Sequence, residues 1–350
     1  MQRAGAIAIA VMILATGTVH AQHAQDEPPP TNLWFVRAGY SPGVVLAASP
    51  FVSGDNGARA MTVEVGRQTD GTRDWHRVYN YPSYGVGFYA GRFNHERELG
   101  HPFGAYGFFS WPFPISDRVH VTTDFGLGVT WHWNEFDPKT NPTNTTLGSD
   151  AAYHIDWGLY LRYLASQRAS VFAGLNVMHW SNGGTKRPNL GLAAVGPKVG
   201  VRYNLAPQVA LPRARPEDLP RFDPSWEFVA GGAGSPQNGT TAFNATAGLQ
   251  RHFYRFGKVA AGADVTRDGQ LALGVYGGYE HVIARFSVLA QFGRTVWREF
   301  EDPDVPRFYQ RYGTRFYFSD HLWGTFAVRT VRLRKARFTE FGLGYRARWN

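Results

Sequence analysis

The chain has 350 residues, no cysteine, 40 glycines and a formal net charge of +9, and 15% of its residues are aromatic while only 18% are charged. This composition disfavours a helical domain, which uses more Ala, Leu, Glu and Lys, and it suits many alternating strands. The positive charge is spread along the chain without a long basic run. A solvated lumen and rim would explain it, and attraction to anionic lipid phosphates is the alternative.

The first 21 residues have the pattern of a secretory signal peptide. Arg3 precedes an apolar stretch from Ala4 to Ala15, and Val19-His20-Ala21 follows as the expected cleavage site. We therefore expect 22–350 to form the mature chain, in an oxidising compartment where a free thiol is a hazard. We expect no nucleic-acid partner there.

No later stretch contains 18 uncharged apolar residues, so the sequence predicts no transmembrane helix in the mature chain. An exported chain without a transmembrane helix is a soluble periplasmic protein, a secreted protein or a β-barrel. Besides the helix, the closed β-barrel is the only structure that satisfies every backbone polar group in lipid.

Alternation of apolar and polar residues predicts strands along the whole mature chain. Two strands are expected between Asn32 and Arg67. The following strands are predicted at 83–93, 103–113, 118–131, 152–164, 169–181, 189–203, 225–233, 240–254, 257–266, 270–281, 284–296, 306–318, 321–332 and 336–349.

The last predicted strand has the clearest alternation. One face carries Phe341, Leu343, Tyr345, Ala347 and Trp349, and the other carries Gly342, Gly344, Arg346, Arg348 and Asn350. Such a strand is typical of a wall between lipid and a wet lumen. If the C-terminus is periplasmic, the short turns 114–117 and 165–168 are also periplasmic and the long segment 132–151 is extracellular, which is the asymmetry of outer-membrane barrels.

The sequence thus predicts an all-β protein, a transmembrane antiparallel β-barrel of about 14–16 strands in the bacterial outer membrane. The Pro-rich segment 206–224 separates 22–205 from 225–350. We expect one closed barrel, with 206–224 as a long periplasmic crossing. The alternative is a linker between two barrels. A single barrel of this size would permit a water-filled lumen.

One segment, 178–191, combines a histidine and a serine with a glycine-rich loop. His179 and Ser181 end a predicted strand on the same face as Val171, Leu175 and Val177, so they should point at the outer leaflet. A serine beside a histidine is the minimum for nucleophilic acyl transfer, and this position would make the substrate a lipid. The alternative is a rim pair that only meets water or lipid headgroups.

The run His179-x-Ser181-Asn182-Gly183-Gly184, followed by Pro188-Asn189-x-Gly191, resembles the signature of the lipid A 3-O-deacylase (PagL-type) family of outer-membrane acyloxyacyl hydrolases. Residues 34–205 match that family's barrel in layout, including Leu147-Gly148-Ser149 and the strand from Lys198 to Tyr203. The remaining part resembles a longer branch of the family, which shares Tyr79-x-Tyr81-Pro82, Leu99-Gly100 and the strands from Gly257 to Trp349.

The resemblance implies a role for each residue of the segment. Ser181 would be the nucleophile and His179 the general base, while the Gly184 N–H and the Asn189 side chain would form the oxyanion hole. Asn182 and Gly183 would shape the loop, because both residue types tolerate left-handed conformations.

This chain departs from the family pattern at the position of the third triad member. It is a glutamate four residues after the oxyanion asparagine, and this chain has Ala193 there, so the triad acid is unknown. Asp156 alternates with lipid-facing residues and should face the lumen, and Asp150 reaches the rim at best.

The resemblance therefore implies an outer-membrane serine esterase that removes an ester-linked acyl chain from lipid A in the outer leaflet. It implies no cofactor and no metal. The alternative is a non-catalytic barrel, either a pore or a lipid-binding structural protein, that has lost the triad acid. The other histidines lie at turns and strand ends without metal-ligand spacing. They include His76, His95, His101, His132, His154, His252, His281 and His321.

Overall fold

The computed structural model describes residues 33–46, 56–207, 217, 219–237, 240–301, 305–333 and 335–349. The predicted signal peptide, 1–21, lies outside the described residues, as do most of the Pro-rich segment and Asn350.

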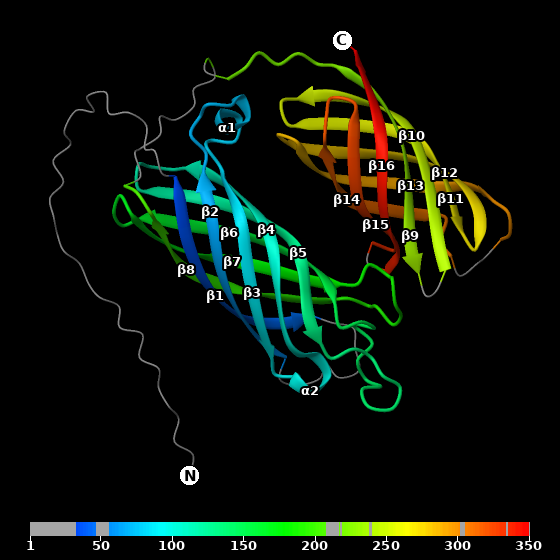
Figure 1. The fold of residues 1–350 in the computed structure, drawn as a ribbon, viewed down its shortest axis with the longest axis horizontal. Coiled ribbons are helices and arrows are strands. Elements are labelled where there is room, and N and C mark those ends of the chain that lie inside the picture. Colours follow the sequence, from blue (N-terminus) through cyan, green and yellow to red (C-terminus); the bar gives the residue numbers. More distant parts are fainter. Residues whose placement is uncertain are drawn as a thin grey trace.

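The described strands form two closed antiparallel barrels of eight strands each, which lie side by side (Figure 1). The strands of the first barrel are β1 (Trp34–Leu46), β2 (Gly57–Gln68), β3 (Ser83–Phe93), β4 (Gly100–Pro114), β5 (Val119–Trp133), β6 (Ala152–Leu164), β7 (Ala169–Ser181) and β8 (Leu192–Asn204). The strands of the second barrel are β9 (Trp226–Gln237), β10 (Thr240–Tyr254), β11 (Gly257–Asp268), β12 (Gln270–Ile283), β13 (Phe286–Arg298), β14 (Phe308–Tyr317), β15 (Leu322–Val331) and β16 (Lys335–Trp349).

The predicted number of strands is confirmed, including the two expected between Asn32 and Arg67. The expectation of one closed barrel is wrong. β8 pairs with β1 and β16 pairs with β9, so each group of eight closes on itself. Alternation along a strand indicates which residues face lipid, but it does not say which strand is the neighbour, and the alternative of a linker between two barrels fits the structure.

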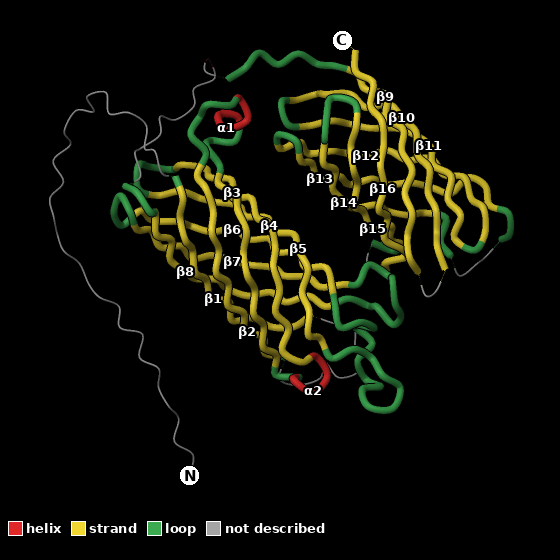
Figure 2. Tube along the Cα trace, in the orientation of Figure 1, coloured by secondary structure: helices red, strands yellow, loops and turns green. Residues whose placement is uncertain are grey.

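Only two short helices interrupt the strands among the described residues, α1 (Asp74–Val78) and α2 (Glu96–Leu99) (Figure 2). No helix within the described ranges is long and apolar enough to cross a membrane.

The two barrels have the same orientation. The loop after β7 contacts β16 near its start, where the Thr339 hydroxyl donates to the Gly183 carbonyl at 3.1 Å. At the opposite end, Tyr79, between β2 and β3, approaches His281 at the end of β12, with Oη and Nε2 3.1 Å apart. Connections after odd-numbered strands therefore meet at one end and those after even-numbered strands at the other. The long loop between β5 and β6 marks the first end as the outside.

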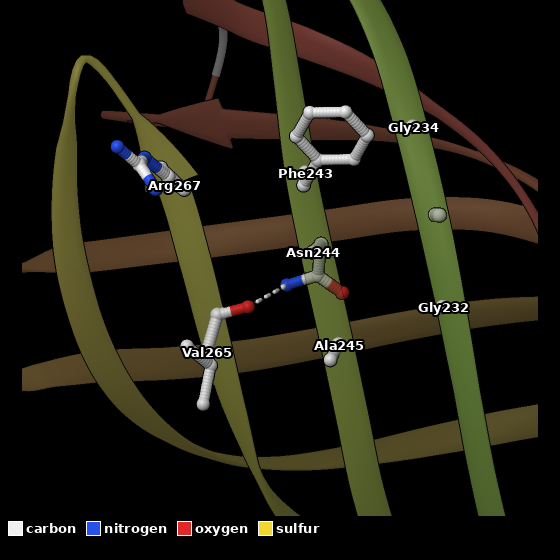
Figure 3. Close-up of a pocket in the computed structure, with 8 residues that line it drawn as sticks. Gly232, Gly234, Phe243, Asn244, Ala245, Val265 and Arg267 are labelled. Carbon is white, nitrogen blue, oxygen red and sulfur yellow. Dashed lines mark hydrogen bonds between the residues drawn. The ribbon is translucent and has the colours of Figure 1, made fainter.

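Side chains alternate between lipid-facing and inward positions along the strands. Leu175 and Leu343 are about two-thirds exposed, at 65% and 68%, whereas the inward Glu227 is fully buried. On the outer surface of the second barrel, Gly232, Gly234 and Ala245 leave a shallow hollow beside Phe243 (Figure 3). This pattern is expected where one face of each strand meets hydrocarbon and the other meets a polar interior.

Ion pairs fill the interior of the first barrel. The Arg37 guanidinium pairs with both Glu64 and Asp124. The Tyr106 hydroxyl donates to Glu64 at 2.6 Å, and deeper along the lumen Lys198 pairs with Asp156 at 3.4 Å.

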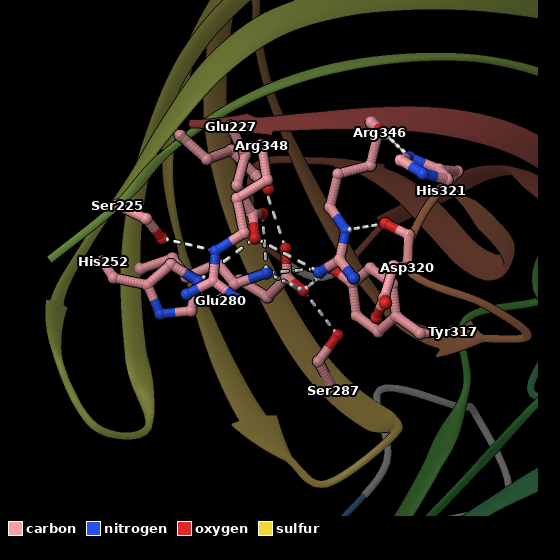
Figure 4. A network of polar contacts seen from close by, with 12 residues as sticks. Ser225, Glu227, His252, Glu280, Ser287, Tyr317, Asp320, His321, Arg346 and Arg348 are labelled. Atoms are coloured by element: carbon pink, nitrogen blue, oxygen red, sulfur yellow. Dashed lines mark hydrogen bonds and ion pairs between the residues drawn. The ribbon is translucent and has the colours of Figure 1, made fainter. Parts of the chain in front are cut away.

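The second barrel has a similar interior centred on Glu227 and Glu280 (Figure 4). Lys258, which is fully buried, lies 2.8 Å from Glu227 and 3.7 Å from Glu280. Glu280 also accepts hydrogen bonds from Arg315 at 2.7 Å and from Ser287 at 2.7 Å.

These interiors do not fit the wide, water-filled lumen that a single large barrel would permit. Eight strands enclose a space just large enough for side chains, and here paired charged side chains occupy it. The lumens are packed cores that support the outer surface.

We predict that Glu280→Ala strongly destabilises the second barrel. It leaves the buried Lys258 and Arg315 without one of their carboxylate partners, and removal of one member of a buried ion pair costs about 3–5 kcal/mol. Denaturant unfolding of the refolded protein in detergent, followed by tryptophan fluorescence, measures the change.

Glu301→Ala is the matched control for this measurement. Glu301 is an exposed carboxylate that pairs with Arg298 and Arg307 in a loop, and such pairs contribute little. Equal losses of stability in the two variants would contradict the view that the buried network holds the barrel together.

Candidate functional site

His179 and Ser181 lie at the outer end of β7 and point away from the lumen. The outward residues Val171, Leu175 and Val177 of the same strand are exposed, whereas the intervening Trp180 is fully buried. The prediction that the histidine and serine lie on the outward face of the strand is therefore confirmed.

The Ser181 hydroxyl oxygen accepts two hydrogen bonds. Asn189 Nδ2 donates to it at 2.9 Å, and the Gly183 N–H donates at 3.1 Å. Asn189 Oδ1 in turn accepts the Asn182 N–H at 3.2 Å. The two acceptor positions of Ser181 are thus occupied, and its own proton stays available for donation.

Asn182 organises the loop through its side chain. Its Nδ2 donates to Ser149 Oγ at 3.1 Å and to the Lys186 carbonyl at 2.7 Å, and its Oδ1 accepts the Gly184 N–H at 2.9 Å. The backbone of Asn182 does not adopt the left-handed conformation. Gly183 (φ +69°) and Gly184 (φ +88°) supply the left-handed turn, so the expected conformational role belongs to the glycines.

The segment Leu147-Gly148-Ser149 packs against the same loop. A Cβ on Gly148 would lie 2.8 Å from backbone atoms of Arg187 and Pro188, which is too close for any side chain. The Leu190 N–H donates to the Thr145 carbonyl at 3.1 Å. The β5–β6 loop therefore supports the β7–β8 loop from beside it.

The imidazole of His179 lies beside the main chain of Leu192 on the neighbouring strand. Ala193 lies directly opposite His179 across the β7–β8 ladder, so no carboxylate occupies the position that faces the histidine. Among the described residues, no hydrogen bond joins His179 to Ser181 and no carboxylate acts on its ring.

The two aspartates considered as substitutes lie elsewhere. Asp156 is buried in the lumen, where it accepts from Asn176 and pairs with Lys198. Asp150 is exposed, and its carbonyl accepts the Trp133 N–H at 3.1 Å. Within the described part of the chain, no three His, Cys, Asp or Glu side chains form a group that would hold a metal ion.

The sequence analysis missed the residues of the second barrel that border this loop. Thr339 donates to the Gly183 carbonyl. The ring centroids of Phe326 and Tyr153 are 4.7 Å apart, and Tyr153 is the cross-strand neighbour of Ser181. Thr339 is 156 residues from Gly183, and no motif in either segment indicates that the two meet.

Two family models match the chain, one over each barrel. Residues 61–202 match the family model described as lipid A 3-O-deacylase (PagL), and residues 224–349 match the one described as acyloxyacyl hydrolase, C-terminal domain. The chain belongs to the lipid A 3-O-deacylase (PagL) family. Like the barrels of that family, this family member is an outer-membrane protein, and it is of the longer branch with an additional C-terminal domain. None of the curated proteins matches the chain.

Solved structures of outer-membrane barrels also align with the chain. Neisserial surface protein A is 10% identical, with a TM-score of 0.35, over 49% of this chain and 97% of its own. The outer-membrane enzyme PagL is 17% identical, with a TM-score of 0.32, over 48% of this chain and 99% of its own. A triple mutant of the Rhodopseudomonas blastica porin is 7% identical, with a TM-score of 0.19, over 90% of this chain and 100% of its own. At these TM-scores none of the three bears on function.

Proposed function

We propose that this family member is a serine esterase that removes an ester-linked acyl chain from lipid A in the outer leaflet. The observation that supports this most directly is the surroundings of Ser181. This serine lies on the outward face at the outer end of β7, and the side chain of Asn189 and the N–H of Gly183 both donate to its oxygen. An ester buried among acyl chains would meet the serine without leaving the membrane.

The reaction begins with attack of Ser181 Oγ on the acyl carbonyl carbon, while His179 takes the hydroxyl proton. The carbonyl oxygen becomes an oxyanion. When the tetrahedral intermediate collapses, the bond between the acyl carbon and the sugar oxygen breaks, and His179 returns the proton to that oxygen. Water then attacks the acyl-serine in the same way and releases the fatty acid.

Two donors are proposed for the oxyanion. Asn189 Nδ2 is already beside the nucleophile, and the Gly184 N–H is the backbone donor that the family signature implies. In the structure the Gly184 N–H donates to Asn182 Oδ1. The oxyanion must therefore take the place of Asn182 Oδ1 as the acceptor. Hydrogen bonds of this kind often reach their catalytic geometry only when substrate is bound.

His179 works in this proposal without a carboxylate. In this proposal one ring nitrogen donates to the Leu192 carbonyl on the neighbouring strand, so the other nitrogen of the neutral ring carries the lone pair that accepts the serine proton. A carbonyl fixes the orientation and the tautomer of the ring. Because it bears no full charge, it stabilises the imidazolium less than a carboxylate would.

Mass spectrometry of lipid A from a Gram-negative host that expresses the protein tests the function. The parent protein should remove one acyl chain, and Ser181→Ala should leave lipid A intact because the nucleophile is gone. His179→Asn should slow the release by a factor of about 10²–10⁴, the usual contribution of a general base.

Ser170→Ala is the matched control, because Ser170 is a serine of the same strand that faces the lumen. Its activity should equal that of the parent. Intact lipid A in cells where the parent is folded in the outer membrane would overturn the proposal and favour a non-catalytic barrel.

We also predict that Ala193→Glu raises the deacylation rate, by about tenfold or more. Residues directly opposite each other on neighbouring strands have Cβ atoms about 5 Å apart, so the new carboxylate reaches His179 and stabilises the imidazolium. The measurement is kcat on lipid A in detergent micelles.

Ala193→Gln separates charge from size in this experiment. It adds a side chain of nearly the same volume without the negative charge, and it should give no such gain. An unchanged kcat in a folded Ala193→Glu protein would contradict this prediction. It would mean that a carboxylate at position 193 does not assist His179 beyond what the Leu192 carbonyl provides.

A further inference from the structure

The second barrel touches the loop of the candidate site directly. Thr339, near the start of β16, donates its hydroxyl proton to the Gly183 carbonyl at 3.1 Å, and none of its surface is exposed. Gly183 is the second residue after Ser181, and its own N–H donates to the Ser181 oxygen. Thr339 of the second barrel is therefore hydrogen-bonded to the loop that follows the proposed nucleophile.

The approach of the second barrel also explains both glycines of the loop. A Cβ on Gly183 would lie 2.0 Å from Thr339 Oγ1, and a Cβ on Gly184 would lie 2.9 Å from the Arg337 carbonyl oxygen. Both distances are shorter than real Cβ contacts. The left-handed turn and the neighbouring barrel therefore independently require glycine at these two positions.

The contact extends to the strand beside Ser181. Tyr153 of β6 is the cross-strand neighbour of Ser181, and its ring packs against Phe326 of β15. The start of β16 is itself anchored, because Arg337 pairs with Asp268 at the end of β11 at 3.0 Å. Thr339 is thus held in place from its own barrel while it holds the loop of the other.

Peptide geometry connects this contact to catalysis. The Gly183 carbonyl and the Gly184 N–H belong to one planar trans peptide unit and point in opposite directions. A hydrogen bond that fixes the direction of the carbonyl therefore fixes the direction of the N–H. That N–H is the backbone donor proposed for the oxyanion.

We propose that the second barrel is part of the catalytic unit and that Thr339 is a positioning residue for the deacylation reaction. Its hydroxyl fixes the Gly183–Gly184 peptide, so that the Gly184 N–H needs only to exchange Asn182 Oδ1 for the oxyanion when substrate binds. The inference rests on the proposed function. It assigns to the C-terminal barrel a role in the chemistry of the first barrel.

The test compares Thr339→Val with Thr339→Ser in the full-length protein, using steady-state kinetics on lipid A in detergent micelles. Valine keeps the shape and removes the hydroxyl, and kcat should fall by a factor of about 10–100 with little change in KM, since the oxyanion exists only after attack. Serine keeps the hydroxyl and should retain most of the parent's kcat.

Thr325→Val is the matched control. Thr325 Oγ1 donates to the Thr314 carbonyl at 3.0 Å within the second barrel, so this variant loses an equivalent hydrogen bond away from the loop. Its kcat should equal that of the parent. Heat-dependent gel migration gives the folded fraction by which each rate is divided, and Thr339→Ala carries the same test if the valine variant does not fold.

The outcomes separate the two proposals. A parent with no activity on lipid A overturns the proposed function and this inference with it. An active parent, an inactive Ser181→Ala variant and a Thr339→Val variant with the parent's kcat overturn the role of Thr339 alone. A loss of kcat that serine does not restore, or that Thr325→Val shares, also overturns it.

Discussion

Within a membrane every backbone N–H and C=O of a strand needs a partner, and this requirement governs the architecture. The chain meets it twice, once where β8 pairs with β1 and once where β16 pairs with β9. Closure fixes the tilt and the register of each strand, so successive side chains alternate between the outer face and the lumen except at a few bulges. The position of Ser181 on the lipid side of β7 is a direct consequence, because Trp180 and Asn182 on either side of it are buried.

The division of labour between inside and outside follows from the size of each barrel. Eight strands leave room only for side chains, and the lumens contain ion pairs such as Arg37 with Glu64 and Lys258 with Glu227. These networks stiffen the walls but exclude a passage for solutes. The candidate site lies on the outer wall, and the proposed substrate would reach it by lateral diffusion in the membrane.

The sequence alone predicts a large part of this structure, because each strand carries its own period-2 signal. The strands on either side of the signature loop were predicted in this way, and the structure has them as β7 and β8, with Ala193 opposite His179. The family signature likewise led to the correct family. These features depend on local sequence, over a few residues or one hairpin.

The features that sequence did not predict all depend on distant parts of the chain. Whether sixteen strands close once or twice depends on the pairing of β8 with β1, which local alternation does not encode. The contact of Thr339 with Gly183 joins two barrels.

The central claim is that the lipid-facing Ser181 is a nucleophile, and a covalent label tests it most directly. A long-chain alkyl fluorophosphonate loses fluoride to an activated serine oxygen and leaves a stable phosphonyl ester. After incubation of the folded protein in micelles and proteolysis, mass spectrometry should find the adduct on the peptide that contains Ser181, and labelling should disappear in His179→Asn. An adduct on another serine, or no adduct on the folded protein, would contradict the account.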